Sequence, residues 1–375
     1  MPHTDTHRLL IARGDLHHTA WRPDPDATRP LEPGQARLAV EQVALTANNI
    51  TYAAFGEAMK YWQFFPAPEP GFGCLPTWGF ATVVESQAEG LAVGRRVWGY
   101  LPLGTHLVVQ PARVRTGGFM DQSPHRAGLA AAYQSYGFCD ADPAWRPELE
   151  GLQAVLKPLF MTAFLLDDFL AEAGFFGARR LLLSSASSKT AFATAFCLAR
   201  RPQGARPAIV GLTSDARVGF VQGLGCYDEV LAYGALESLP ADEPAVYVDF
   251  AGDAGLRRRV HQHWADRLGF SSSIGGTHWR ELGSGGGLPG PRPTLFFAPA
   301  QAARRSGPPP EGWGAEAFGQ RLAEGWQAFL AAVQRGPEPW VRIVQRQGPA
   351  AAEAAYRALV DGTADAREGV MIDLR

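Results

Sequence analysis

The stretch Arg180-Leu-Leu-Leu-Ser-Ser-Ala-Ser-Ser-Lys-Thr-Ala191 decides the fold. Residues 180–184 form a short apolar run that is typical of a buried strand, and residues 189–201 have the apolar spacing of a helix. Only small residues stand in the turn between them. Because a strand that runs through a tight turn into a helix is the first half of a βαβ unit, this stretch predicts a parallel sheet.

The same alternation of strand and helix continues toward the C-terminus. Short apolar strands that alternate with amphipathic helices predict a doubly wound sheet that helices cover on both faces. The expected strands are 180–184, 208–213, 229–231, 245–250, 269–274 and 294–297, and the helices between them include 189–201, 216–223 and 255–268.

The two ends of the chain have a different pattern. Residues up to about 120 read as strands and turns with frequent Gly and Pro, as in a small barrel or sandwich. From residue 152 the apolar spacing becomes helical. A long helix is expected at 315–334, followed by a strand, a helix and a strand at 340–344, 350–359 and 369–374.

A chain of 375 residues is too long for one ordinary core, so we expect two domains in an α/β protein. The first is a β-rich domain built from residues 1–150 and 338–375. The second is a Rossmann-type, doubly wound domain built from residues 151–337.

Composition excludes several classes of partner. The 35 basic and 37 acidic side chains leave a net charge of −2, which offers no electrostatic footprint for nucleic acid or an anionic membrane. The run Arg257-Arg258-Arg259 is expected to be a solvated helix face. No apolar stretch reaches the roughly 18 residues that span a bilayer, and we do not expect the N-terminal residues to act as a signal peptide. The 4 cysteines form no Cys-x-x-Cys pair, so we expect a cytoplasmic protein without a disulfide framework.

Three segments resemble a known family. Val43-Ala-Leu-Thr-Ala-Asn-Asn-Ile-Thr-Tyr-Ala-Ala-Phe-Gly56, Gly90-Leu-Ala-Val-Gly-Arg-Arg-Val-Trp-Gly99 and Leu224-Gly-Cys-Tyr-Asp-Glu-Val-Leu-Ala-Tyr233 are similar to segments of the medium-chain dehydrogenase/reductase superfamily. The order of domains resembles its zinc-free, quinone-oxidoreductase-like side, in an uncharacterised branch. The resemblance implies a GroES-like catalytic domain, a Rossmann domain and a C2 homodimer that pairs through the edge strand 294–297.

Zinc members of this superfamily have a Cys ligand in the early catalytic segment and a His-Glu pair some twenty residues later. Here residues 46–49 hold no Cys and residues 71–79 hold no His-Glu pair. Cys74 and His106 lack a third ligand, and catalytic zinc needs three protein ligands. We therefore expect no metal and expect Cys74 to be a small buried residue.

The nucleotide loop departs from the family pattern. Where the family has glycines that let the backbone approach a pyrophosphate, this chain has Ser185, Ser188 and Lys189. The loop either still binds phosphate, through the hydroxyls of Ser187 and Ser188 and the Lys189 ammonium, or its serines only cap the helix. Uniformly short side chains, and a cation where the helix dipole disfavours one, favour phosphate binding.

The end of the second strand indicates NADP(H) rather than NAD(H). NAD sites place Asp or Glu there, whereas NADP sites use Arg. This strand ends with Thr213 and Ser214, and Arg217 follows in the first helical turn. Asp215 is expected to cap that helix.

The resemblance also implies residues along the nicotinamide and in the substrate cleft. Thr162 on the connecting helix is expected to face the nicotinamide. The remaining expected cofactor contacts are Ala251, Gly275, Gly276 and Phe297, and the expected substrate-cleft residues are Asn48, Tyr61, His278 and Trp279.

Tyr52 is the expected proton donor, with Asn49 as an amide donor beside it. The alternative is an ordinary half-buried Tyr whose hydroxyl bonds to the backbone. The leading hypothesis is an NADPH-dependent, zinc-free oxidoreductase that reduces an activated alkene, quinone or related carbonyl compound, with an apolar small-molecule substrate. The alternatives are a non-redox enzyme on the same fold and a non-catalytic nucleotide-binding or interaction protein.

Overall fold

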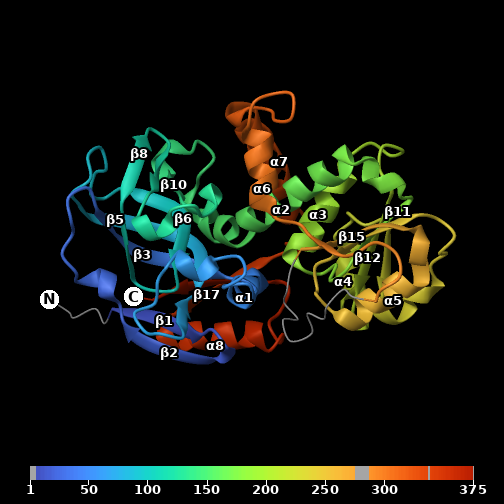
Figure 1. The fold of residues 1–375 in the computed structure, drawn as a ribbon, viewed down its shortest axis with the longest axis horizontal. Coiled ribbons are helices and arrows are strands. Elements are labelled where there is room, and N and C mark those ends of the chain that lie inside the picture. The colour runs from blue at the N-terminus through green and yellow to red at the C-terminus, as the bar shows by residue number, and fades with distance from the viewer. Residues whose placement is uncertain (1–5, 275–286, 337, 375) are drawn as a thin grey trace. The chain divides into compact units, whose positions relative to one another are not determined.

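The computed structural model describes residues 6–274, 287–336 and 338–374. The chain divides into two compact units (Figure 1). Unit 1 comprises Met1–Val155 and Val341–Arg375, and unit 2 comprises Leu156–Trp340. No helix in the described parts of the chain is both long enough and apolar enough to cross a membrane.

Unit 1 is built on a mixed nine-stranded sheet and a separate three-stranded sheet. The larger sheet has the order β17-β18-β3-β5-β6-β10-β9-β8, with β7 paired to β3, and the smaller has the order β2-β1-β4. The strands are β1 (His7–Ala12), β2 (Asp15–Pro23), β3 (Ala36–Leu45), β4 (Phe72–Cys74), β5 (Pro76–Ser86), β6 (Arg96–Pro102), β7 (His106–Val109), β8 (Pro111–Arg115), β9 (Gly118–Asp121), β10 (Ser135–Phe138), β17 (Arg342–Gln347) and β18 (Glu368–Asp373).

The C-terminal segment adds two strands to the large sheet of unit 1. Strands β17 and β18 pair in parallel, and helix α8 (Gly348–Val360) connects them. Strand β18 then pairs antiparallel with β3, so the segment joins the sheet of unit 1. This confirms the predicted order of strand, helix and strand. The Tyr356 hydroxyl donates to the Leu16 carbonyl at 2.9 Å and anchors α8 on the β1–β2 hairpin.

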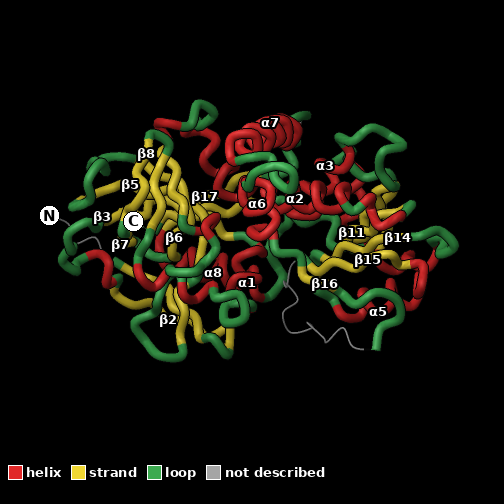
Figure 2. The backbone as a smooth tube through the Cα atoms, turned by 45° about the horizontal axis from the view of Figure 1, so that its top comes forward, coloured by secondary structure: helices red, strands yellow, loops and turns green. Residues whose placement is uncertain are grey.

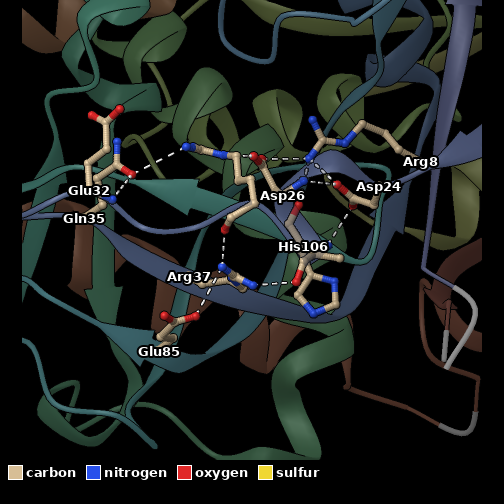
Figure 3. Close-up of polar contacts among 10 residues, drawn as sticks. Arg8, Asp24, Asp26, Glu32, Gln35, Arg37, Glu85 and His106 are labelled. Carbon is tan, nitrogen blue, oxygen red and sulfur yellow. Dashed lines mark hydrogen bonds and ion pairs between the residues drawn. The ribbon is translucent and has the colours of Figure 1, made fainter. Parts of the chain in front are cut away.

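A buried ionic network holds the N-terminal strand of unit 1 (Figure 3). Arg8 Nη2 lies 2.8 Å from Asp24 Oδ1 and 2.9 Å from Asp26 Oδ2. The second Asp24 oxygen accepts the His106 backbone N–H at 2.9 Å. Arg37 donates to the carbonyls of Ala27 and Arg29, each at 2.5 Å. Because every one of these charged groups has partners within unit 1, the network has a structural role.

Unit 2 contains a six-stranded, entirely parallel sheet with the order β13-β12-β11-β14-β15-β16 (Figure 2). This order confirms the predicted doubly wound Rossmann fold. The strands are β11 (Arg180–Leu183), β12 (Ala208–Thr213), β13 (Glu229–Ala232), β14 (Ala245–Asp249), β15 (Leu268–Ser273) and β16 (Thr294–Leu295). Besides α8, the α-helices of the described residues are α1 (Ala47–Ala54) in unit 1, α2 (Glu150–Glu172), which continues from unit 1 into unit 2, and α3 (Lys189–Ala199), α4 (Val218–Gly223), α5 (Ala254–Trp264), α6 (Ala298–Ser306) and α7 (Ala315–Val333) in unit 2.

Apolar side chains pack against the parallel sheet and in a second region of unit 2. On one face Leu182, Tyr247 and Trp264 belong to a core under α5. Elsewhere in unit 2 an aromatic cluster joins α2, α3 and α7, with Phe160 stacked on Phe329 at 5.1 Å between ring centroids. Helix α3, predicted from its spacing, supplies Phe196 to the same cluster, 5.2 Å from Phe329.

Two predictions about unit 2 are wrong in detail. The edge strand expected at 294–297 is only Thr294–Leu295, because Pro299 lies in the first turn of α6 and a helix starts at Ala298. Arg257 is not on a solvated face: it is 6% exposed and its Nη2 lies 2.8 Å from Asp249 Oδ2. Arg258 beside it is exposed, as expected.

Candidate functional site

The glycine-free loop connects β11 to α3 at the carboxyl end of the first strand of unit 2. Ser185 has a φ of 49°, a left-handed conformation that usually requires glycine. Its N–H donates to the Tyr233 hydroxyl at 3.2 Å. Ser188 is the N-cap of α3, and its hydroxyl accepts the Ala191 N–H at 3.4 Å. The loop therefore has a left-handed turn at Ser185 although it has no glycine.

Arg217 reaches this loop from the neighbouring strand. It follows β12, which ends at the buried Thr213, and its Nη1 donates to the Ser187 hydroxyl at 3.3 Å. Ser214 is half-buried at the start of the same turn. Thus two of the residues expected to bind the cofactor, Arg217 and Ser187, are brought into direct contact.

Two tyrosines support the loop from the side of β12 and β13. The Tyr227 hydroxyl donates to the Ala186 carbonyl at 2.8 Å. A Cβ on Gly211 would lie 2.8 Å from the Tyr227 ring, so glycine is required there for the ring to lie against the strand. Tyr233 follows β13 and binds the Ser185 N–H. Burial raises the pKa of both phenols, so both are protonated at neutral pH.

A buried carboxylate fixes the ends of the two central strands. Ser184, directly after β11, donates to Asp249 Oδ1 at 3.0 Å, and its oxygen accepts the Phe250 N–H at 2.9 Å. Asp249 also accepts two bonds from Arg257, at 3.0 Å from Nε and 2.8 Å from Nη2. These hydrogen bonds therefore hold the end of β14 to the start of the loop between β11 and α3. Both lie at the carboxyl edge of the sheet, where a doubly wound sheet binds ligands.

The other expected cofactor contacts have local roles. The Ala251 N–H donates to Ser184 Oγ at 3.2 Å, and Phe297 is the half-buried N-cap of α6. Thr162 donates its hydroxyl to the Pro158 carbonyl of its own helix at 3.2 Å. Lys189 is half-buried at the start of α3 and has an interaction within the protein. Gly275, Gly276, His278 and Trp279 lie outside the described residues.

Unit 1 contains a second group of expected site residues, gathered around a buried sheet face. Trp78 on β5 stands directly opposite Tyr100 on β6. Tyr52 comes from α1, and Tyr61 from the 3₁₀ turn Tyr61–Gln63. We call Tyr52, Tyr61, Tyr100 and Tyr133 the tyrosine cluster. Its ring centroids are separated by 4.7 Å between Tyr100 and Tyr133 and by 4.8 Å between Tyr52 and Tyr61.

The hydroxyl groups of the tyrosine cluster lie close together. The Tyr52 hydroxyl accepts the Trp78 Nε1–H at 3.1 Å, and the Tyr61 and Tyr133 hydroxyls are 3.5 Å apart. Asn48, half-buried on α1, also interacts with the Tyr52 phenol. Burial, with the neighbouring phenols, raises the pKa of Tyr52 and of Tyr100 well above the ordinary value for tyrosine. All four phenols are therefore hydrogen-bond donors at neutral pH, because burial also raises the pKa of Tyr61 and Tyr133.

Asn49 has a positioning role in this group. Its Oδ1 accepts the Thr46 N–H at 2.6 Å, and its Nδ2 donates to the Pro76 carbonyl at 2.8 Å. Asn49 is 2% exposed. Its amide therefore caps α1 and ties that helix to β5, which places Tyr52.

Cys74 and His106, the two zinc candidates considered from the sequence, each have surroundings within unit 1. Cys74 is fully buried and burial raises its pKa to about 11, as expected for an apolar position. The His106 Nδ1 lies 3.0 Å from the Thr105 hydroxyl. Within the described ranges, no group of three His, Cys, Asp or Glu side chains is placed to hold a metal ion.

Sequence reasoning missed several residues of these two groups. Tyr233 ends the family-like segment 224–233, and that position was the available signal for it. Tyr100 and Trp78 belong to the segments Trp78-Gly-Phe80 and Trp98-Gly-Tyr100, which alternate aromatic residues with glycine on two paired strands. This shared pattern could have placed their aromatic rings on one face.

Comparison with solved structures defines the class of fold. The CurK enoyl reductase superimposes with a TM-score of 0.55 at 16% identity, covering 99% of this chain and 100% of that chain. CurA from Vibrio vulnificus, solved in complex with NADPH, gives 0.58 at 11% identity, covering 98% and 99%. The quinone oxidoreductase from Coxiella burnetii gives 0.51 at 11% identity, covering 99% of each chain. The chain thus has the GroES-like and Rossmann fold of the medium-chain dehydrogenase/reductase superfamily, which confirms the resemblance.

The family itself follows from the sequence match. Residues 43–365 match the family described as "Protein of unknown function (DUF2855)", and the chain belongs to that family. No curated protein matches the sequence. The chain therefore combines membership of this family with the fold of that superfamily.

Proposed function

We propose that the protein is an NADPH-dependent, zinc-free oxidoreductase, with unit 2 (expected as 151–337) as its nucleotide domain and unit 1 (expected as 1–150 and 338–375) as its catalytic domain. The observation that carries this proposal is the contact between Arg217 and Ser187 at the carboxyl edge of the parallel sheet. It joins the loop after the first strand to the end of the second strand, the two places that hold the pyrophosphate and the 2′-phosphate in a Rossmann site.

The residues of unit 2 fit NADPH by their chemistry. A guanidinium beside hydroxyl groups matches a phosphate ester, which accepts several charge-assisted hydrogen bonds. Arg217, Thr213 and Ser214 would hold the 2′-phosphate, and Ser185, Ser187, Ser188 and Lys189 would hold the pyrophosphate. Ala251, Phe297 and Thr162, with Gly275 and Gly276 outside the described residues, would complete the site. CurA from Vibrio vulnificus, which shares the fold, was solved with NADPH.

Unit 1 supplies the groups that act on the substrate. NADPH, when bound, supplies the hydride for reduction of an activated alkene, a quinone or a related carbonyl compound. Tyr52 and its neighbours donate hydrogen bonds to the substrate oxygen and stabilise the negative charge that develops on it. Asn48 and Tyr61 line the apolar substrate site, together with His278 and Trp279, which lie outside the described residues. Burial raises the pKa of the Tyr52 phenol, so it stays protonated at neutral pH and can donate a hydrogen bond to that charge.

Turnover tests this proposal. NADPH absorbance is followed in the presence of the protein and, in turn, a quinone, an enone and a saturated ketone. The proposal predicts consumption of NADPH with the quinone or the enone. NADPH consumption with none of the three compounds, by protein that binds NADPH, would contradict the redox assignment.

One observation favours a different function, a non-catalytic nucleotide-binding or interaction protein. Several polar groups of the loop have partners inside the protein: Ser185 N–H with Tyr233, Ala186 C=O with Tyr227, and Ser188 Oγ with Ala191 N–H. A loop whose polar groups already have hydrogen-bond partners in the protein is stable without a bound phosphate. The same turnover experiment separates the two functions, because only the oxidoreductase consumes NADPH.

The proposal also includes the assembly and location of the protein. Leu295 on the edge strand β16 is 45% exposed, and we propose that this edge pairs in a C2 homodimer. A monomer in light scattering at micromolar concentration would contradict it. All four cysteines are free, which suits the reducing cytoplasm that we propose as its location.

A further inference from the structure

Ser184 is a buried side chain whose hydroxyl makes every hydrogen bond that a hydroxyl can make. It lies directly after β11 and is fully buried. The hydroxyl donates to Asp249 Oδ1 at 3.0 Å and accepts the N–H groups of Phe250 and Ala251, at 2.9 and 3.2 Å. A hydroxyl offers one donor and two acceptor positions, and all of them are used here. A buried polar group that is satisfied in this way holds its neighbours in one arrangement.

Asp249 connects the ends of three neighbouring strands. Besides the Ser184 hydroxyl, its Oδ1 accepts the N–H groups of Ala251 at 3.2 Å and of Gly252 at 2.9 Å. Its backbone carbonyl accepts the N–H of Ile274, directly after β15, at 2.9 Å. These hydrogen bonds therefore join the residues that follow β11, β14 and β15 at the carboxyl edge of the parallel sheet.

The two oxygens of the Asp249 carboxylate have different partners. Oδ2 accepts from Arg257 of α5, at 3.0 Å from Nε and 2.8 Å from Nη2, and both side chains are buried. Oδ1 accepts from Ser184 and from the backbone of residues 251–252. A buried carboxylate whose charge is paired and whose two oxygens are both hydrogen-bonded keeps a fixed orientation. Arg257 therefore fixes the carboxylate that orients Ser184.

The segments on either side of this contact are the ones that face the nucleotide under the proposed function. The loop 185–188 follows Ser184, and residues 250–252 follow Asp249. The loop has no glycine, and Ser185 has a φ of 49°. Because a left-handed conformation is unfavourable for a residue other than glycine, contacts from outside the loop must stabilise this turn.

We propose that Ser184 and Asp249 are positioning residues that couple the loop 185–188 to residues 250–252, so that the two segments become ordered together. The inference rests on the proposed function for its consequence, which is that NADPH contacts both segments. A ligand that meets two ordered segments avoids the loss of affinity that arises when binding must order them. Ser184 and Asp249 act through these segments, since both side chains are buried.

Amide hydrogen exchange of the full chain, measured on its peptides by mass spectrometry, tests the coupling without a nucleotide. Ser184→Ala removes one donor to Asp249 and the acceptor of two backbone N–H groups. We expect faster exchange in residues 250–252 and also in the loop 185–188. The loop is the decisive segment, because the hydroxyl itself bonds to residues 249–251 and not to the loop. Exchange that is unchanged in the loop would overturn the coupling.

Ser271→Ala is the matched control. Ser271 is a buried serine of β15, and its hydroxyl lies 2.9 Å from His261 Nε2. The control therefore removes a buried hydroxyl of the same sheet that bonds to neither segment. It should lower the melting temperature and leave exchange in both segments unchanged. Loop exchange that increases equally in Ser271→Ala would show a general loss of stability and would contradict the role of Ser184.

Nucleotide titration of the same variants measures the consequence of the coupling. Ser184→Ala is expected to weaken NADPH and NADH by the same factor, about tenfold, because both nucleotides contain the pyrophosphate and the nicotinamide. Adenosine 2′,5′-bisphosphate lacks both groups and spans only part of the site, so its affinity should fall by less. A serine with a structural role alone would leave all three affinities of the folded protein unchanged, and that result would also overturn the inference.

The two measurements distinguish this inference from the proposed function. Faster exchange in both segments of Ser184→Ala, in a protein that binds neither NADPH nor NADH, supports the coupling and contradicts the NADPH-dependent function. Binding of NADPH that Ser184→Ala does not weaken, with unchanged exchange in the loop, supports the cofactor assignment and contradicts the coupling.

Discussion

Arg217 Nη1 donates a hydrogen bond to Ser187 Oγ at 3.3 Å, across the ends of the neighbouring strands β11 and β12. The residue expected to select NADP(H) therefore lies against the loop expected to hold the pyrophosphate. In a loop without glycine, this contact places a guanidinium beside the hydroxyl groups that would bind a nucleotide phosphate.

Arg217→Ala is expected to weaken NADPH binding and to leave NADH binding nearly unchanged. Loss of a charge-assisted contact costs about 1.5–3 kcal/mol, or roughly ten- to a hundredfold in affinity. Fluorescence titrations with the two nucleotides measure the difference, and Arg258→Ala, an exposed arginine of the same unit, is the charge control. Equal losses of affinity for both nucleotides would show that Arg217 does not bind the 2′-phosphate.

Ser185→Gly is expected to raise the free energy of unfolding by up to about 1 kcal/mol. Ser185 has a φ of 49°, and a left-handed backbone costs a non-glycine residue about 1–2 kcal/mol. Glycine removes this cost, but its greater conformational freedom in the unfolded chain cancels part of the gain in stability. Ser185→Val, with a branched side chain, should lower it by about 1–2 kcal/mol. Urea denaturation provides both values, and a loss in the glycine variant as large as in the valine variant would refute the strain argument.

Arg257→Ala is expected to destabilise the protein by about 3–5 kcal/mol, because it leaves the Asp249 carboxylate buried without its cation. The adjacent Arg258→Ala should change stability by no more than about 0.5 kcal/mol, since Arg258 is exposed. Denaturant unfolding of the two variants provides the comparison. Similar values for both would contradict the structural role of the Asp249–Arg257 pair.

His261 is expected to make stability depend on pH. Its side chain is fully buried; Nδ1 lies 2.9 Å from the Pro289 carbonyl and Nε2 lies 2.9 Å from the Ser271 hydroxyl. The carbonyl can only accept, so the neutral ring donates from Nδ1 and accepts at Nε2. Burial lowers the pKa of His261 below its ordinary 6.5. The unfolded chain therefore binds more protons below about pH 6.5, and stability falls as the pH decreases from there toward the lower folded pKa.

Urea denaturation at a series of pH values tests this dependence. His261→Gln should flatten the decrease of stability below about pH 6.5. A slope that is the same in the protein with and without His261 would show that this ring does not titrate as described.

The parallel sheet could be predicted because its signals are local. The apolar run before Ser184 and the small residues after it define a strand, a turn and a helix within a dozen positions. The strand expected at 294–297 ends early because α6 begins at Ala298, and Pro299 in its first turn is a local signal that favours the helix over the apolar pattern.

Contacts between distant segments could not be predicted in the same way. The Asp249–Arg257 pair depends on which face of α5 meets the sheet, and a run of three arginines does not show which one turns inward. The tyrosine cluster draws on α1, β6 and two 3₁₀ turns, so no single segment carries its pattern. The sequence predicts Tyr52 and Tyr61 as residues of the substrate site. Tyr100 can be assigned to the same cluster only when the pairing of β5 with β6 is known.

Thermal denaturation with increasing NADPH or NADH tests the central claim most directly, that the glycine-free loop binds NADP(H). A ligand that binds only the folded state at a hundred times its dissociation constant adds about 2.7 kcal/mol of stability. We predict a melting temperature that rises with NADPH and rises much less with the same concentrations of NADH. A melting temperature that is unchanged by either nucleotide, up to millimolar concentration, would contradict the account.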